Sequence, residues 1–489
     1  MRTKIFLFGL SLLLLQGCGY EFPTSSTAEE PDLKELNLDR MTIIGSTISA
    51  GYMNGALYNE GESHSYGALI DSLLNMDSFT PLSIDSKYGY NRNTGSGILG
   101  RFYLSFRNPI QDWPARYNED GEAISNFNGD INQVTNFSIP GLKSFQIDDS
   151  DALSGNTYFD RILDKGVNES LLDLALQQDP TVVLFEPGTE DILGHVTLGA
   201  AGEVDPLATD ISYSDLTPES VFEDNLNDAI NRILNESSSE IFMLNIPDFT
   251  PMSYFSELIW YFSPSEWASI TTGSYPPFGL YFDFNQDVQE HNSTADREER
   301  RPTIVFDGTG GNAFRSKVIQ DKYLSDAQNN EGDTIPKYRQ MTDDDHFLYN
   351  VERIYTERIQ NDEVTFGSYQ PIDDMFILTK TEKEVAEERR EAYNAIIENI
   401  AANNTRVHLV DFAGLIEGVN NGLVSYDGVT YSLGFDNKTV VSADGYTLNH
   451  RGQALLANEI IKVMNANFGS NISSIDVNGL KGTDIKLDF

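Results

Sequence analysis

The chain has 489 residues, in which 75 acidic side chains outnumber 33 basic ones and give a formal charge of -42 at neutral pH. A charge of this sign and size repels phosphate backbones and anionic lipid headgroups, and it excludes nucleic acid as a partner. The 40% of hydrophobic residues can fill the core of one large globular domain or of two smaller ones.

The chain begins with a short apolar segment. Arg2 and Lys4 precede an apolar run over residues 5–15, which is too short to span a bilayer and has the length of a secretion signal. The run leads into residues 15–18 (LQGC), which resemble the lipobox of bacterial lipoproteins, where the cysteine is acylated after cleavage. Cys18 is the only cysteine and can form no internal disulfide. We therefore predict a lipoprotein signal peptide over residues 1–17 and a lipid on Cys18, the alternative being a free thiol.

The segment after Cys18 is rich in Ser, Thr, Glu and Pro and poor in large apolar residues, so residues 18–39 predict a flexible tether. Gly19 follows the cysteine, and no Asp stands there to suggest retention in the inner membrane, which favours the outer membrane. The residues leave open whether the body faces the periplasm or the cell surface. Residues 40–480 are expected to form the folded body, and residues 481–489 a C-terminal tail.

Strands and helices are expected to alternate along the body. Short apolar runs bounded by turn residues predict buried parallel strands at residues 41–44, 181–185, 241–244 and 407–410. One amphipathic helix is expected after Pro218, and another after a capping box of Thr379 with Glu382. A last helix is expected over about residues 451–467, ended by Gly469. This alternation predicts a doubly wound α/β fold with a parallel sheet.

Two stretches interrupt the alternation, residues 75–135 and residues 251–370, and both are expected as insertions above the carboxyl ends of the strands. The second begins with a dense aromatic run over residues 254–267, which we interpret as the insertion's own core. The glycine-rich residues 308–311 lack the strand-helix unit and downstream acid of a nucleotide loop. They are interpreted as a turn, and no cofactor is expected.

Four sequence blocks resemble those of the SGNH (GDSL) hydrolase family and occur in the family's order. They are residues 43–52 (IIGSTISAGY), 136–141 (NFSIPG), 185–191 (FEPGTED) and 444–452 (DGYTLNHRG). Residues 245–248 (NIPD) and the helix before residue 407 also resemble a branch of outer-membrane lipoproteins with this fold. The likeness covers about residues 40–480. It implies an SGNH-hydrolase-like, doubly wound (flavodoxin-like) sheet with large insertions at the C-terminal ends of the strands.

The resemblance also implies where catalytic side chains would lie, and most of them are replaced. The family's nucleophilic Ser falls on Thr47, its oxyanion-binding Asn on Glu190 and its His on Thr447. Only Gly141, Gly188 and Asp444 match. Thr447 cannot act as a base near neutral pH, and an ionised Glu190 would put negative charge where an oxyanion must form. Loss of the nucleophile or the base costs on the order of 10⁶ in rate. We therefore expect these degenerate positions to support no catalysis.

An active lipase or esterase of this family is the alternative, if the chemistry has moved to other residues. Ser46 or Thr47 would then be the nucleophile and His450 or His64 the base, although His450 lies nearly a helical turn beyond the family's position. The remaining histidines show no paired spacing typical of a metal site, and no metal is expected at His195, His291, His346 and His408.

The residues and the resemblance together predict a non-catalytic, lipid-anchored binding or scaffolding protein of the outer membrane. Lipoproteins of this location commonly accompany β-barrel machines for transport or protein assembly, so an outer-membrane β-barrel complex is the expected partner. A glycan- or lipid-binding module, which keeps the old cleft for a small ligand, is the other alternative.

Overall fold

The structure is a computed structural model that describes residues 32–90, 100–108, 111–116, 121–163, 168–272, 279–307, 315–349 and 366–487. The expected signal peptide, Cys18 and most of the expected tether lie outside these residues. Within the described ranges, no helix is long and apolar enough to cross a membrane.

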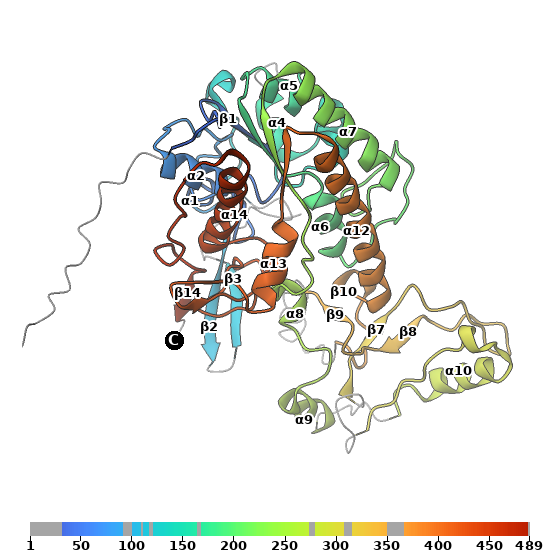
Figure 1. The fold of residues 1–489 in the computed structure, drawn as a ribbon. Helices are drawn as coiled ribbons and strands as arrows, with labels where there is room; N and C mark the ends of the chain where they lie inside the picture. The colour runs from blue at the N-terminus through green and yellow to red at the C-terminus, as the bar shows by residue number, and fades with distance from the viewer. Residues whose placement is uncertain are drawn as a thin grey trace, which may run out of the picture.

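A five-stranded parallel sheet forms the centre of the body (Figure 1). Its strands are β1 (Met41–Gly45), β4 (Asn136–Ser138), β5 (Val182–Phe185), β6 (Glu240–Leu244) and β11 (Val407–Val410). They pair in the order β11-β6-β5-β1-β4, and every pair is parallel. Counted along the chain this order is 2-1-3-4-5, one of the two common orders of doubly wound sheets. The predicted α/β class with a parallel sheet is confirmed, and β1, β5, β6 and β11 lie where the apolar runs predict them.

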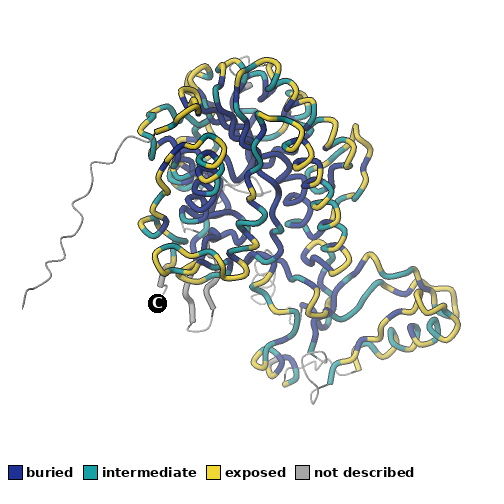
Figure 2. The backbone as a smooth tube through the Cα atoms, in the orientation of Figure 1, coloured by how far each residue is buried: buried dark blue, intermediate teal, exposed yellow. Residues whose placement is uncertain are grey.

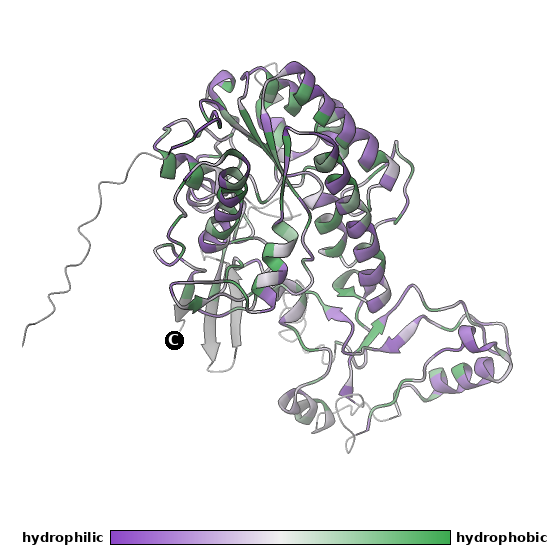
Figure 3. Cartoon of the chain, viewed as in Figure 1, coloured by the Kyte–Doolittle hydropathy of each residue, from purple (hydrophilic) through white to green (hydrophobic). Residues whose placement is uncertain are grey.

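Helices cover both faces of the sheet. On one side lie α7 (Glu219–Glu236) and α12 (Lys380–Asn403), and on the other α2 (Tyr66–Leu74) and α14 (His450–Phe468) (Figure 1). Apolar residues lie along the inward faces of the long helices and polar residues along their outward faces (Figure 3), and all four residues of β5 are buried. The shorter helices are α1 (Asn59–Glu62), η1 (Ile131–Gln133), η2 (Ser144–Gln146), α3 (Ser150–Leu153), α4 (Thr157–Leu163), α5 (Leu171–Leu176), α6 (Thr189–Val196) and α13 (Phe412–Asn420).

The predicted helix signals lie at the observed helix ends. Pro218 is the N-cap of α7. The Thr379 side chain accepts from the Glu382 amide and the Glu382 side chain bonds back, which makes the predicted capping box of α12. Gly469 ends α14 in the left-handed conformation, with φ 66°. These predictions depend on local hydrogen bonding, which explains why they can be made from sequence.

The folded body begins before the expected end of the tether. Leu36 and Leu38 are buried in the main hydrophobic core, and the Asp32 amide donates to the Asn471 side chain at 2.7 Å. The expected tether over residues 18–39 is therefore too long at its C-terminal end. Two leucines among polar residues are enough to dock this segment, because their burial offsets its ordering entropy.

The first insertion carries the hairpin of β2 (Phe102–Asn108) and β3 (Gln111–Arg116). β14 (Ile485–Leu487) pairs with β2 in parallel and completes a three-stranded sheet. The expected C-terminal tail at residues 481–489 is thus wrong for residues 485–487, which satisfy their backbone hydrogen bonds on the edge of β2. A further small hairpin consists of β12 (Ser425–Tyr426) and β13 (Val429–Thr430).

The second insertion leaves the carboxyl end of β6 and packs first against the body through α8 (Ser253–Ser256). Residues 257–345, which we call the lobe, then project from the body (Figures 1 and 2). The lobe contains α9 (Pro264–Thr272), α10 (Phe282–Thr294), η3 (Arg297–Glu299), β7 (Val318–Gln320) and β8 (Tyr338–Gln340). At its base lie β9 (His346–Phe347), η5 (Asp374–Phe376) and β10 (Ile377–Leu378).

The aromatic run divides between two cores. Phe262 and Trp267 are buried in a small cluster of the lobe itself, which confirms the interpretation for them. Tyr254 and Phe255 instead join the main core of the body. The lobe therefore has small hydrophobic clusters of its own, and a further cluster joins it to the segments at its base.

Candidate functional site

Three of the positions singled out in the sequence meet at the carboxyl edge of the sheet. Thr47 lies in the turn after β1, Gly141 follows β4, and Glu190 lies in the first turn of α6, after β5. The Gly141 amide donates to the Thr47 hydroxyl at 3.2 Å. The Thr47 hydroxyl in turn donates to the Glu190 carboxylate. A hydroxyl thus connects a backbone donor to an acidic side chain.

Tyr213 holds the Glu190 carboxylate from a second side. The Tyr213 hydroxyl donates to its other carboxylate oxygen at 2.7 Å. Glu190 itself is only 1% exposed. A buried carboxylate needs donors on its oxygens, and Thr47 and Tyr213 supply one for each.

The two remaining positions form a second group on the same edge. The Thr447 hydroxyl and amide donate to the Asp444 carboxylate at 2.6 and 2.9 Å. The Gly55 amide donates to the same carboxylate at 2.8 Å. Because Gly55 belongs to the loop that begins near Thr47, the loop places both groups on one side of the sheet.

Tyr446 lies between the two groups. Burial raises the pKa of its phenol well above the usual value, and the neighbouring Tyr52, Asp444 and Tyr213 raise that pKa further. Tyr213 belongs to the Glu190 group and Asp444 to the Thr447 group. Tyr446 thus interacts with a member of each group.

The start of the second insertion closes this edge from outside. The Tyr254 amide donates to the Gly445 carbonyl at 2.9 Å, and a Cβ on Gly445 would lie 2.7 Å from the same amide nitrogen. The ring of Tyr254 packs edge-on against Tyr446 at 5.3 Å between centroids. Thr47 and Thr447 are consequently only 5% and 0% exposed.

Glu186, to which the sequence assigned no role, fixes the turn after β1. Its carboxylate accepts from the Ser46 hydroxyl at 2.9 Å and from the Ser49 amide at 2.8 Å, as well as from the Ser49 hydroxyl. The Ser46 hydroxyl, the alternative nucleophile, thus donates its hydrogen bond to the Glu186 carboxylate. The only sequence signal was the position of Glu186 directly after a buried strand.

A second buried polar group beside the site, around Asp191 and Lys143, was also not predicted from the sequence. Asp191 accepts from the amide and hydroxyl of Ser144, both at 2.9 Å. Lys143 is 2% exposed and donates through its ammonium to the carbonyl of Asp215. Burial lowers the pKa of Lys143, against the opposing charges of Asp191, Glu190 and Asp215. These contacts hold α6 against the turn after β4.

The two candidate bases lie together, away from the hydroxyls. The rings of His64 and His450 stack at 4.0 Å with an interplanar angle of 12°. Burial, and then the neighbouring His64, lower the pKa of His450 to about 4. The other charges that act on His450 are those of Glu60, Lys481 and Asp484. In the described part of the chain, no imidazole makes a hydrogen bond with Ser46 or Thr47.

The other histidines have separate structural partners or lie on the surface. His195 bonds the carbonyl of Ser214, His346 that of Phe255, and His408 the carboxylate of Glu240. His291 lies on α10 in the lobe. Among the described residues, no group of three His, Cys, Asp or Glu side chains could hold a metal ion.

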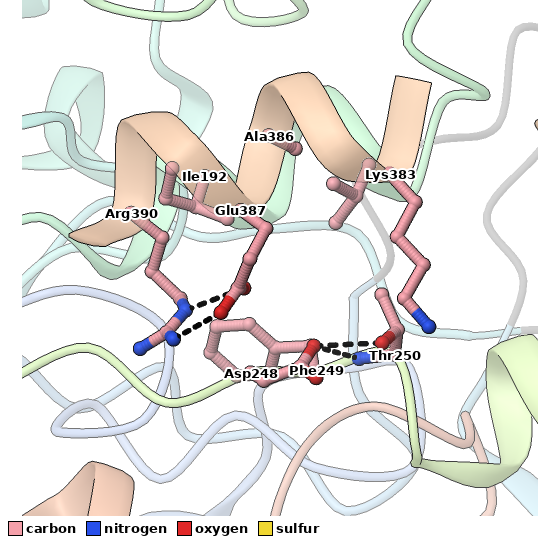
Figure 4. A pocket seen from close by; sticks show the side chains of 9 residues that line it. Ile192, Asp248, Phe249, Thr250, Lys383, Ala386, Glu387 and Arg390 are labelled. Carbon is pink, nitrogen blue, oxygen red and sulfur yellow. Dashed lines mark hydrogen bonds and ion pairs between the residues drawn. The ribbon is translucent and has the colours of Figure 1, made fainter. Parts of the chain in front are cut away.

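A small hollow lies elsewhere, between α12 and the loop after β6 (Figure 4). Its wall carries the ion pair of Arg390 with Glu387, at 2.8 Å, and the hydrogen bonds of Thr250 to Asp248. The cavity volume is about 10 Å³, which has room for about one water molecule. It is too small for an organic ligand.

We compared the chain with protein-family models, with characterised proteins and with solved structures, and none of the three comparisons gives a match.

Proposed function

We propose that the chain is an outer-membrane lipoprotein with an SGNH-hydrolase-like body that has lost its chemistry and acts as a binding or scaffolding subunit. The observation that carries this proposal is the bond from the Thr47 hydroxyl to the buried Glu190 carboxylate. In a serine-type hydrolase the nucleophilic oxygen gives its proton to an imidazole and its product oxyanion binds N–H donors. In this chain the carboxylate of Glu190 takes the position at which the family has an N–H donor.

Charge explains why this arrangement is worse than an empty position. A negative carboxylate beside the reacting oxygen would repel an oxyanion in a buried setting where electrostatic interactions are strong. The Gly141 amide, which the resemblance assigns to the oxyanion, already donates to Thr47. The geometry therefore supports a structural use of the old site.

The proposed partner is an integral β-barrel protein of the outer membrane. The N-terminal pattern ending at Cys18 supports location at that membrane, and the projecting lobe supports a role in contact with another protein (Figure 1). The charge of -42 argues against nucleic acid and against anionic lipid as the ligand.

Activity can be tested directly on the purified protein. We expect no hydrolysis of short-chain aryl esters above the buffer rate and no labelling by a fluorophosphonate, which needs an activated hydroxyl. An active serine hydrolase in the same buffer is the positive control. Stoichiometric labelling of Ser46 or Thr47 would restore the esterase alternative.

The partner is tested by purification from detergent-solubilised membranes. We expect a β-barrel protein, identified by mass spectrometry, in near-stoichiometric amount with the chain. A monodisperse monomer under mild detergent conditions would argue against the scaffolding role, even if the chain proves inactive.

A further inference from the structure

The lobe meets the body at a cluster of charged side chains around Lys322. Lys322 follows β7 in the lobe, and its ammonium donates to the carbonyl of Ala200 in the body. The same ammonium lies 2.8 Å from the carboxylate of Glu382, in the first turn of α12. It also lies 3.6 Å from the carboxylate of Asp374, in η5. One cation of the lobe thus faces two acids that belong to two other segments.

The two acids are incompletely satisfied. The Glu382 side chain is 0% exposed, and its Oε2 accepts from the amide and hydroxyl of Thr379. Its Oε1 makes the ion pair with Lys322 without hydrogen-bond geometry, and Asp374 Oδ1 is buried without a donor. Buried acceptors without donors are costly, and two carboxylates against one ammonium leave a surplus negative charge. A proton on either acid removes the surplus charge and supplies a missing donor.

We propose that Lys322, Glu382 and Asp374 form a proton-dependent fastening between the lobe and the body. The fastening is tight when one of the two acids carries a proton and loosens when both are ionised. It acts on the position of the lobe and not on the buried site at the sheet edge. It does not depend on the proposed function, because it concerns the isolated chain.

The charged groups around the cluster show which of them titrates near neutral pH. Burial, and next the charge of Asp374, raise the pKa of Glu382 to about 7. Burial also raises the pKa of Asp374. From the lobe, Tyr323 and Asp321 face the cluster, and burial raises the pKa of the Tyr323 phenol further from neutrality.

Lys322 and the nearby His195 keep their charge states between pH 6 and pH 8. Although burial opposes it, the Glu382 carboxylate raises the pKa of Lys322, so the ammonium stays charged. Burial lowers the pKa of His195, which Lys322 also faces, to about 4, so this ring stays neutral above pH 6. Glu382 is therefore the group in this cluster whose protonation changes between pH 6 and 8.

A second contact, the hydrogen bond from the Lys380 amide of α12 to Asp345, keeps the lobe attached when the first loosens. Arg339 of β8 pairs with Asp345 at 2.6 Å and with Asp321 at 2.6 Å. Asp345 also accepts from the Lys380 amide at the start of α12, at 3.0 Å. Although burial opposes both shifts, the pair raises the pKa of Arg339 and lowers that of Asp345. Asp345 therefore stays an ionised acceptor for the Lys380 amide across the neutral range, so the expected change is local loosening and not detachment.

The direction of the pH effect follows from proton linkage. Glu382 binds a proton more tightly in the closed joint than in an opened one, where its pKa returns towards the ordinary value of 4.5. Closure is therefore favoured at low pH and is weakened as pH rises through about 7. Full exposure of one such group on opening predicts about tenfold less protection at pH 8 than at pH 6.

The test is hydrogen–deuterium exchange of the purified full chain in detergent at pH 6 and pH 8, corrected for the intrinsic exchange rate. We expect amides of β7, of the turn at Lys322 and of the first turn of α12 to lose protection at pH 8. Equal corrected protection at both pH values in the native chain would overturn the proposal.

Variants distinguish a pH effect at the joint between lobe and body from a pH effect on the stability of the whole protein. Glu382→Gln keeps the capping box, because Gln serves at this position as Glu does, and should make joint protection independent of pH. Glu62→Gln removes another buried acid whose pKa burial raises to about 7, but far from the joint, and should leave the joint's pH dependence unchanged. Lys322→Met should reduce protection most strongly at pH 8. Retention of the native pH dependence in Glu382→Gln would also overturn the proposal.

Discussion

Two threonines of the same segment have opposite surroundings. Thr42 in β1 is 1% exposed and its hydroxyl has no hydrogen-bond partner. Thr47, in the turn that follows, accepts from Gly141 and donates to Glu190. The value of a buried hydroxyl depends on such partners, because an unsatisfied polar group costs free energy and a satisfied one contributes it.

Replacing each threonine with valine should therefore have opposite effects on stability. Thr47→Val leaves the buried Glu190 with one donor fewer, and we expect it to lower the free energy of unfolding by about 1–3 kcal/mol. Thr42→Val, the matched control, removes an unpaired hydroxyl from a strand and should be neutral or stabilising. Urea denaturation measures both. Equal losses in the two variants would show that the Thr47–Glu190 bond contributes nothing specific.

Glu62 predicts a pH dependence of stability within the body. Its carboxylate accepts from the Ile84 amide at 3.2 Å, and burial raises its pKa to about 7. The folded chain therefore binds this proton more tightly than the unfolded chain, and the stability that it contributes at low pH is lost as pH rises to about 7. Relative to that of Glu62→Gln, the free energy of unfolding of the native chain should fall by up to about 3 kcal/mol between pH 4.5 and pH 7. If the difference in the free energy of unfolding between the two proteins stays constant across this range, Glu62 does not titrate as described.

At the scale of elements, the entry to α6 depends on a glycine. Gly188 has φ +82°, and a Cβ there would lie 2.6 Å from Ile246 and 2.8 Å from Phe222. Both neighbours belong to the packing that holds α7 and the loop after β6 against the site. The strand β5 can pass into α6, and so present Glu190, only with no side chain at this position.

Gly188→Ala should be destabilising for two reasons, and a matched variant separates them. Gly428 has a similar φ of +80° but nothing within 4 Å of a built Cβ. Gly428→Ala therefore isolates the backbone strain, about 1–2 kcal/mol. We expect Gly188→Ala to cost a further ~1–3 kcal/mol from overpacking, measured by thermal and urea unfolding. Similar losses at the two sites would mean that Phe222 and Ile246 move aside freely.

Local patterns in the sequence predict most of the central fold. β1 and β5 are fully buried apolar runs, β6 is buried except at its first residue, and β11 is buried at its two end residues. The ends of α12 and α14 carry side-chain or glycine caps. β4 is missed as an apolar run because it has three residues, two of them polar, and it is held mainly by pairing with β1. The pairing of β14 with β2 is missed for the same reason, since long-range pairing leaves no local signal.

The candidate site is predictable only in part. The order of strand ends explains why Thr47, Gly141 and Glu190 meet, because all three follow neighbouring parallel strands. Tyr213, Tyr254 and Tyr446 close the same edge, but they come from loops and an insertion whose paths depend on tertiary packing. Their positions at this edge could not be predicted from spacing.

For the molecule as a whole, the proposed attachment to the membrane rests on one residue, Cys18. The body carries most of the charge of -42 and cannot bind an anionic lipid surface by itself. We expect Cys18→Ser to leave an unprocessed precursor or to release the chain into the soluble fraction, without fatty-acid label. Ser25→Ala, in the same segment, should fractionate with membranes like the native chain. A Cys18→Ser protein that still carries label would refute the lipoprotein proposal.

The contact between Asp32 and Asn471 fixes the point at which a tether to a bilayer would enter the body. It pins the chain where the N-terminal segment leaves the body, on the side away from the lobe (Figure 1). Between Cys18 and Asp32 a fully extended chain spans at most about 50 Å. A lipid in the leaflet would thus hold the body from its amino-terminal side, opposite the lobe (Figure 1). A barrel that recognises the lobe would have to contact the protein on the side opposite to its tether.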